Sequence, residues 1–91
     1  MKNLAGKDYL IGGEVQGVGF RYFAVHAARE IGVTGWTRNL SDGRVEVHAN
    51  GTMRQLDEFE ARLRLGPPHA EVRSFEAQES AVSDATDFHI R

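Results

Sequence analysis

The sequence contains no cysteine among its 91 residues. This excludes disulfides, thiolate nucleophiles and zinc sites built from cysteine. The sequence also has no excess of basic residues, because 11 Lys and Arg stand against 13 Asp and Glu, for a net charge of −2. A nucleic-acid-binding domain of this size is typically basic, so the charge disfavours that class and we expect no nucleic-acid partner.

Long apolar runs are lacking as well. No segment approaches the roughly 20 consecutive apolar residues that cross a bilayer. The opening MKNLAGK has a positive charge without the apolar stretch of a signal peptide behind it. We therefore expect a cytoplasmic protein without a membrane partner. The length suffices for one small domain with a single core, and we expect a monomer.

Strand and helix patterns alternate along the first half of the chain. An apolar, β-rich run at residues 9–15 predicts a strand. Apolar residues spaced i, i+3, i+4 and i+7 between positions 24 and 31 predict a helix, which Gly32 would end. Residues 33–40 predict a second strand, and Val45, Val47 and Ala49 form the core side of a third strand at 44–49.

The second half of the chain begins with a helix start signal. Thr52 and Gln55 form a capping box, and the apolar face that follows consists of Leu56, Phe59 and Leu63. The residues Gly-Pro-Pro at 66–68 would end this helix. A strand is expected within residues 70–78, and a short final strand at 87–91.

The order of these elements predicts the fold. It matches βαββαβ, an α+β ferredoxin-like sandwich with an antiparallel sheet and two helices on one face. In this topology the strand at 44–49 lies between the strands at 9–15 and 33–40, which run parallel to each other. Their carboxyl ends therefore meet at the same edge of the sheet. We expect the domain to span residues 7–91, after a short tail at 1–6.

The segment EVQGVGFRYF, residues 14–23, joins the first strand to the first helix. Gly12 and Gly17 have the spacing of a P-loop, but Val18 and Gly19 stand where Lys and Ser or Thr are required. A dinucleotide fingerprint starting at Gly17 also fails, because Tyr22 replaces its last small residue. These two classes of nucleotide site are excluded.

The spacing of a different phosphate cradle is present. Counted back from Arg21, the position of the nucleophilic cysteine in a C-x₅-R loop is occupied by Val15. Glycines let backbone N–H groups converge on an anion at a helix N-terminus, and an arginine fork matches phosphate oxygens. From these residues alone, a phosphate site and a glycine turn with a surface arginine are both open.

Asn39 ends the second predicted strand, and three interpretations of it are possible. Asn39-Leu40-Ser41 fits a glycosylation sequon, which has no weight without a secretory signal. Asn39 can help the hairpin turn at residues 41–43. Alternatively its amide binds or orients a water or a substrate oxygen near the loop, which lies two strands away, roughly 9.6 Å at a strand spacing of ~4.8 Å.

Two motifs resemble those of a known family, and this resemblance favours a phosphate site at the loop and a functional role for Asn39. VQGVGFR (15–21) and GWTRNLSDGRVEV (35–47) resemble the signatures of the acylphosphatase family, and GPPHAEV (66–72) and FHIR (88–91) are similar as well. The resemblance implies a small ferredoxin-like enzyme that hydrolyses the carboxyl-phosphate bond of acyl phosphates, releasing a carboxylate and inorganic phosphate. It implies no metal and no cofactor. Because the leaving carboxylate needs little protonation, our own hypothesis is that water attacks phosphorus in line.

The resemblance also implies the site residues. Arg21 matches the substrate-binding arginine and Asn39 the water-positioning asparagine. The phosphate-binding loop comprises Val15, Gln16, Gly17, Val18, Gly19 and Phe20. Two positions depart from the family pattern: Glu14 replaces a basic residue, which puts substrate affinity in question, and Ser41 replaces a proline, which affects only the hairpin.

Other functions have less support. The histidines at 26, 48, 69 and 89 have no metal-ligand spacing. An RNA-recognition module shares the order of elements, but the strand at 44–49 lacks the aromatic residues that stack on bases. The alternative function is a non-catalytic ferredoxin-like ligand-binding module, against which only Arg21 and Asn39 argue.

Overall fold

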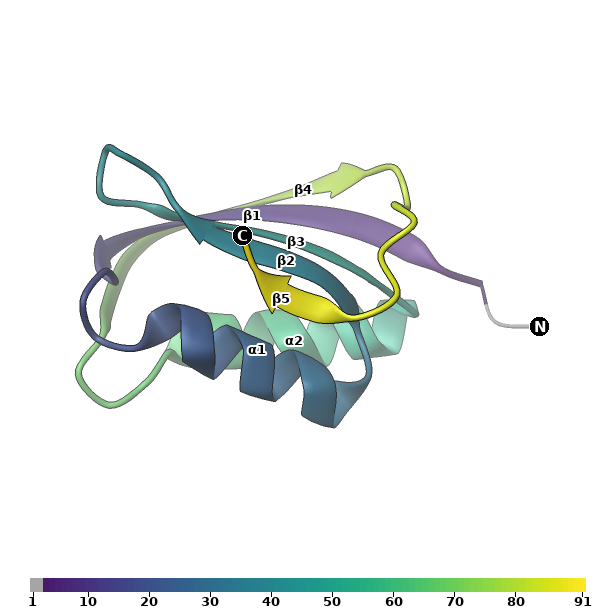
Figure 1. Cartoon of the computed structure of the whole chain (residues 1–91), viewed down its shortest axis with the longest axis horizontal. Coiled ribbons are helices and arrows are strands. Elements are labelled where there is room, and N and C mark those ends of the chain that lie inside the picture. Colours follow the sequence, from purple (N-terminus) through teal and green to yellow (C-terminus); the bar gives the residue numbers. More distant parts are fainter. Residues whose placement is uncertain (1–2) are drawn as a thin grey trace.

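The computed structural model describes residues 3–91, in which five strands form one sheet and two helices cover one face of it (Figure 1). The elements, in chain order, are β1 (Ala5–Glu14), α1 (Phe20–Ile31), β2 (Thr34–Asn39), β3 (Val45–Gly51), α2 (Met53–Leu65), β4 (Glu71–Ser80) and β5 (Phe88–Ile90). The sheet order is β4-β1-β3-β2-β5. The ferredoxin-like architecture is confirmed, including the position of β3 between β1 and β2.

The last strand departs from the antiparallel sheet that we expected. β5 pairs with β2 in parallel, from Gly35↔Phe88 to Thr37↔Ile90, whereas the other strand pairs are antiparallel. β4 runs opposite to β1, and the chain reverses once between β4 and β5. β5 therefore runs in the same direction as β1 and β2, and it can only join the edge of β2 in parallel.

The first strand begins earlier than predicted. Ala5 and Gly6 already pair with Gly51 and Asn50 of β3, so β1 extends toward the N-terminus beyond the predicted strand at 9–15. The sequence here has no apolar pattern that would predict a strand. Backbone pairing with the neighbouring strands holds this part of β1 in the sheet. Residues 1 and 2 lie outside the described part of the chain.

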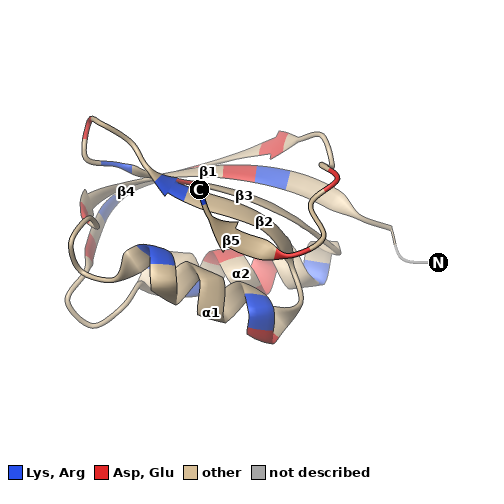
Figure 2. Ribbon diagram, viewed as in Figure 1, with Lys and Arg blue, Asp and Glu red and all other residues tan. Residues whose placement is uncertain are grey.

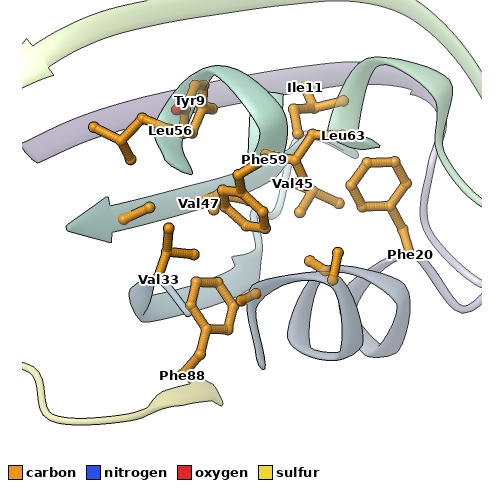
Figure 3. Packing of buried hydrophobic residues seen from close by; sticks show 14 of the residues in the cluster. Tyr9, Ile11, Phe20, Val33, Val45, Val47, Leu56, Phe59, Leu63 and Phe88 are labelled. Atoms are coloured by element: carbon orange, nitrogen blue, oxygen red, sulfur yellow. The ribbon is translucent and has the colours of Figure 1, made fainter. Parts of the chain in front are cut away.

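The core lies between the sheet and the helices (Figure 3). Val45, Val47 and Ala49 of β3 are fully buried, as their alternation predicted. The helix α2 covers them with three buried residues, Leu56, Phe59 and Leu63, and α1 contributes Ala24, Ala27 and Ala28. The small alanines let α1 lie close to the sheet, and this fixes where its N-terminus points.

The three helix ends that the sequence predicted are present. Gly32 ends α1 in the left-handed conformation (φ 99°), where its N–H donates to the carbonyl of Ala28 at 2.8 Å. Thr52 and Gln55 form the reciprocal capping box of α2, with bonds of 2.9 and 3.2 Å. The helix stops at Leu65, before the Gly-Pro-Pro segment.

The four histidines are placed apart. His48 is buried on the open face of the sheet and contacts Asp8 (Nδ1–Oδ1, 2.7 Å), whereas His26, His69 and His89 are exposed. Within residues 3–91 no group of three or more His, Cys, Asp or Glu is arranged to hold a metal ion. Neither helix in this part of the chain has the length and apolar character needed to cross a membrane.

Candidate active site

The sheet topology brings the two motifs to one end of the molecule. Ile11 of β1 and Asn39 of β2 both pair with Val45, from opposite sides of β3. The chain leaves β1 three residues beyond Ile11, at Glu14, and enters the loop 15–19. This loop and the β2–β3 hairpin lie at the same end of the sheet (Figure 1), so segments about twenty positions apart in sequence become neighbours.

The loop is anchored at both ends by the core. Val15 and Phe20 are each only 1% exposed, and Figure 3 shows the Phe20 ring among the residues packed between sheet and helices. Between these anchors, Gly17 and Gly19 adopt φ angles of 76° and 80°. A side chain would find open space at either position, so it is the backbone conformation that requires glycine.

The N-terminus of α1 is uncapped. Gly19 occupies the N-cap position and has no side chain to bond the first N–H groups, and the first turn holds no acidic residue. The first N–H groups of a helix have no partner within the helix. Together with the helix dipole they favour a negative charge at this point. This end of α1 is therefore suited to an anion.

These elements surround a pocket of about 220 Å³. It is lined by Val15, Gly17, Gly19, Phe20, Arg21, Tyr22 and Asn39. Two members of the predicted loop, Gln16 and Val18, do not line it: the Gln16 amide bonds the hairpin and Val18 packs against the core. The structure thus brings both predicted catalytic residues into the pocket with four of the six predicted loop residues.

Tyr22 is a pocket residue that the sequence analysis missed. Its side chain is 72% exposed, although it is one of the larger side chains of the protein. It directly follows Arg21 in the first turn of α1 and stands at the mouth of the pocket. No sequence pattern marked it, because one exposed aromatic residue in a helical segment is unremarkable by itself.

Arg21 is half-buried and lines the pocket. No carboxylate or carbonyl group among residues 3–91 pairs with its guanidinium. Arg29, in the last turn of the same helix, instead contacts Asp87 (Nη2–Oδ2, 3.5 Å) and the carbonyl of Phe88 (3.1 Å). A planar fork of donors without a protein partner, beside a helix N-terminus, is suited to the oxygens of a phosphate group.

Asn39 lines the same pocket. Its amide oxygen is buried and accepts no hydrogen bond from the described residues. The hairpin is held by other groups: Leu40 N–H donates to Arg44 O (2.8 Å), and the Asp42 carboxylate accepts from the Arg44 N–H (3.0 Å). That N–H bond is the main cause that lowers the pKa of Asp42. The side chain of Asn39 is therefore not needed to form the turn.

The two departures from the family pattern lie outside the pocket lining. Glu14 is exposed and lies 3.6 Å from Arg73 (Oε1–Nη1) on the neighbouring strand β4. Its negative charge is thus partly balanced on the side of the sheet away from Asn39. Ser41 is exposed in the turn, where the Asp42–Arg44 contacts provide the rigidity that a proline would add.

The fold and the pocket together define a class of protein: a small ferredoxin-like domain with a glycine loop, an uncapped helix N-terminus, an arginine and an asparagine at one end of its sheet. The acylphosphatase family model matches residues 7–90. The chain is 47% identical over 85 residues to the acylphosphatase of Solibacter usitatus, covering 93% of this chain and 88% of the relative. It is 42% identical over 83 residues to that of Archaeoglobus fulgidus, covering 91% and 93%.

A comparison with a solved structure supports the same family. The crystal structure of acylphosphatase from Bacillus subtilis superimposes with a TM-score of 0.93 at 34% identity, covering 98% of this chain and 99% of that one. The chain therefore belongs to the acylphosphatase family. It is a hydrolase of acyl phosphates, and the alternative of a non-catalytic binding module is not supported.

Proposed function

We propose that the pocket hydrolyses acyl phosphates without a metal or cofactor, by in-line attack of water on phosphorus. The observation that carries this proposal is that Arg21 and Asn39 line the same pocket, and that the Asn39 amide oxygen accepts no hydrogen bond from the described residues. The first has the charge and shape to hold a phosphate, and the second has the acceptor needed to orient a water.

The phosphate group would lie in the loop 15–20. Its equatorial oxygens accept hydrogen bonds from the backbone N–H groups around Gly17 and Gly19 and from the Arg21 fork. These donors also stabilise the charge that the same oxygens carry in the transition state, where phosphoryl transfer depends on positioning and electrostatics. A positive field built from the chain itself is sufficient for this purpose.

The attacking water would be held by Asn39. The water donates one O–H to the amide oxygen, which directs a lone pair of the water oxygen toward phosphorus. As the new P–O bond forms, the bond from phosphorus to the acyl oxygen breaks, and its electron pair leaves with the carboxylate. The proton of the water passes to a phosphate oxygen or to solvent. A carboxylate is a good leaving group, so no general acid is required.

In this proposal the nucleophile comes from outside the protein. Val15 occupies the position at which cysteine phosphatases carry their nucleophile, and its side chain is 1% exposed and apolar. Water is therefore the only nucleophile that this pocket needs to accommodate. The products are a carboxylate and inorganic phosphate, and the phosphate remains a competitive ligand of the loop.

The same proposal includes how the protein works in the cell. We infer a cytoplasmic monomer that acts on a small molecule and binds neither nucleic acid nor membrane. Acidic and basic segments are interspersed along the ribbon (Figure 2), which disfavours a dedicated polyanion surface.

Metal independence is the first testable consequence. Hydrolysis of acetyl phosphate or benzoyl phosphate by the purified protein should proceed at the same rate in excess EDTA as in buffer, because Arg21 and backbone N–H groups supply the positive charge. The rate of release of inorganic phosphate, corrected for hydrolysis without protein, measures this. Loss of activity in EDTA that Mg²⁺ or Zn²⁺ restores would show that the proposed site is wrong.

The direct attack of water on phosphorus is the second testable consequence of the proposal. In H₂¹⁸O the enzyme should place ¹⁸O in the inorganic phosphate and none in the carboxylate, since the P–O bond is the one that breaks. Mass spectrometry of both products checks this. Rapid quenching with ³²P-labelled substrate should leave no label on the protein. Label in the carboxylate, or a stoichiometric phosphoenzyme, contradicts the mechanism.

A further inference from the structure

Gln16 belongs to the loop but turns away from the pocket. Its side-chain Nε2 donates to two backbone carbonyls of the β2–β3 hairpin, Leu40 O at 2.8 Å and Arg44 O at 3.0 Å. The side chain is half-buried and does not line the pocket. A primary amide has two N–H bonds in one plane, so a single Gln16 NH₂ group satisfies both carbonyls at once.

The two carbonyls form the base of the hairpin. The N–H of Leu40 donates to Arg44 O at 2.8 Å, and the N–H of Gly43 donates to Leu40 O at 3.2 Å. Leu40 is the residue next to Asn39, so the bond from Gln16 fixes the backbone one peptide beyond the asparagine. Gln16 itself is the residue next to Val15, where the loop begins.

This contact joins two segments that share no strand pairing. The loop follows β1 and Asn39 ends β2, and β3 lies between those strands. Within residues 3–91 the two Gln16 bonds are the hydrogen bonds that connect residues 15–20 with residues 39–44. The Gln16 side chain therefore links the loop directly to the hairpin beside Asn39, in addition to the pairing of β1 and β2 with β3.

We propose that Gln16 is a positioning residue, which holds Asn39 in register with the phosphate loop so that the water is aligned with phosphorus. This inference rests on the proposed function of Asn39 and adds a role that neither the pocket nor the loop spacing assigns. Gln16 would act through Asn39, touching neither substrate nor water. Alignment of an attacking group is sensitive to small displacements, since a shift of about 1 Å can cost roughly 10²-fold in rate.

Gln16→Met tests the proposal because it keeps the length of the side chain and removes its donors. Both hairpin carbonyls retain their backbone partners, so the variant should fold. We expect kcat for benzoyl phosphate to fall about 10-fold, as a partial misalignment would cause. The inhibition constant of inorganic phosphate should change less than about 2-fold, because the loop N–H groups and Arg21 still bind it. Steady-state kinetics with phosphate as inhibitor measures both.

The matched control is Gln55→Met. Gln55 is also half-buried and also bonds backbone, through its Nε2 to the carbonyl of Ile31 at 3.2 Å, but it joins the two helices away from the pocket. Its loss should lower the melting temperature and leave kcat unchanged. If Gln16→Met lowers the melting temperature and leaves kcat unchanged in the same way, Gln16 is only a structural residue and the proposal is overturned.

A double mutant separates action through Asn39 from any other effect. In the Asn39→Ala background, Gln16→Met should cause no further loss of kcat, because the group that it positions is gone. Multiplicative losses, or a phosphate inhibition constant that rises in parallel with the loss of kcat, overturn the proposal. If instead the native protein does not hydrolyse acyl phosphates, or Asn39→Ala retains full activity, the proposed function has failed first.

Discussion

Replacing Asn39 with alanine is expected to lower kcat for acyl phosphates by roughly 10²–10³, the typical cost of removing one preorganised group from an active site. Inorganic phosphate should still inhibit competitively with a similar inhibition constant. In the proposed mechanism the amide oxygen orients the water, whereas the loop and Arg21 hold the phosphate, so kcat should fall while the inhibition constant of phosphate stays similar. A release assay for inorganic phosphate, with phosphate as the added inhibitor, gives both values.

The hairpin should survive this substitution. Its bonds come from the backbone of Leu40 and Arg44 and from the Asp42 carboxylate, and removal of a buried, unpartnered amide oxygen leaves no other group without a partner. Asn50→Ala is the matched control. Asn50 is a buried asparagine of β3 that bonds Thr34 and Ser83. It lies at the opposite end of the β2–β3 pairing from Asn39.

The control variant should be less stable and still active. Asn50 satisfies polar groups, so its removal should lower the melting temperature, while kcat of the folded protein stays near that of the native chain. If Asn39→Ala is also folded and has near-normal kcat, the prediction is wrong and the water-binding half of the proposed site is removed.

Much of the fold was predictable because local signals agreed with one another. The alternation of Val45, Val47 and Ala49 identified both the strand and its buried side, and the capping box at Thr52 identified the start of α2. The glycine at position 32 predicted the end of α1, and in the structure it adopts the left-handed conformation. Each of these signals lies within a few residues of sequence, where propensity and side-chain chemistry act directly.

The errors concern elements that only tertiary pairing stabilises. Residues 5 and 6 extend β1 by bonding β3 and have no pattern of their own. β5 is three residues long, and its parallel pairing follows from the reversal of the chain after β4. A short edge strand has few side chains to carry information about its direction, so the topology decides it.

The site was predictable in part. Arg21 and Asn39 came from the resemblance together with the expected parallel placement of β1, which precedes the loop, and β2, and the structure brings both residues to one pocket. Tyr22 and the hairpin bonds of Gln16 were not predicted. A glutamine that donates to backbone carbonyls 24 and 28 residues away has no periodic signature, because its partners are groups that every residue carries.

Arg21→Lys is expected to lower kcat/KM for acyl phosphates by roughly 10²-fold, although it keeps the positive charge. A lysine is a point charge on a flexible stem and cannot donate two parallel bonds to phosphate oxygens. In the proposed mechanism the fork contacts the phosphate in both the ground state and the transition state, so KM should rise and kcat should fall. The test requires kinetics on a variant whose circular dichroism spectrum matches that of the native protein.

Folding should be insensitive to this change. A cation in the first turn of a helix is mildly unfavourable, and Arg21 makes no ion pair within residues 3–91, so its replacement removes no stabilising contact of the described chain. Arg29→Lys is the control on the same helix: Arg29 pairs with Asp87 at the far end of α1, and kcat/KM should not change there. Retained kcat/KM in folded Arg21→Lys would mean that charge alone matters at this position, and the guanidinium fork would no longer explain how the loop holds a phosphate.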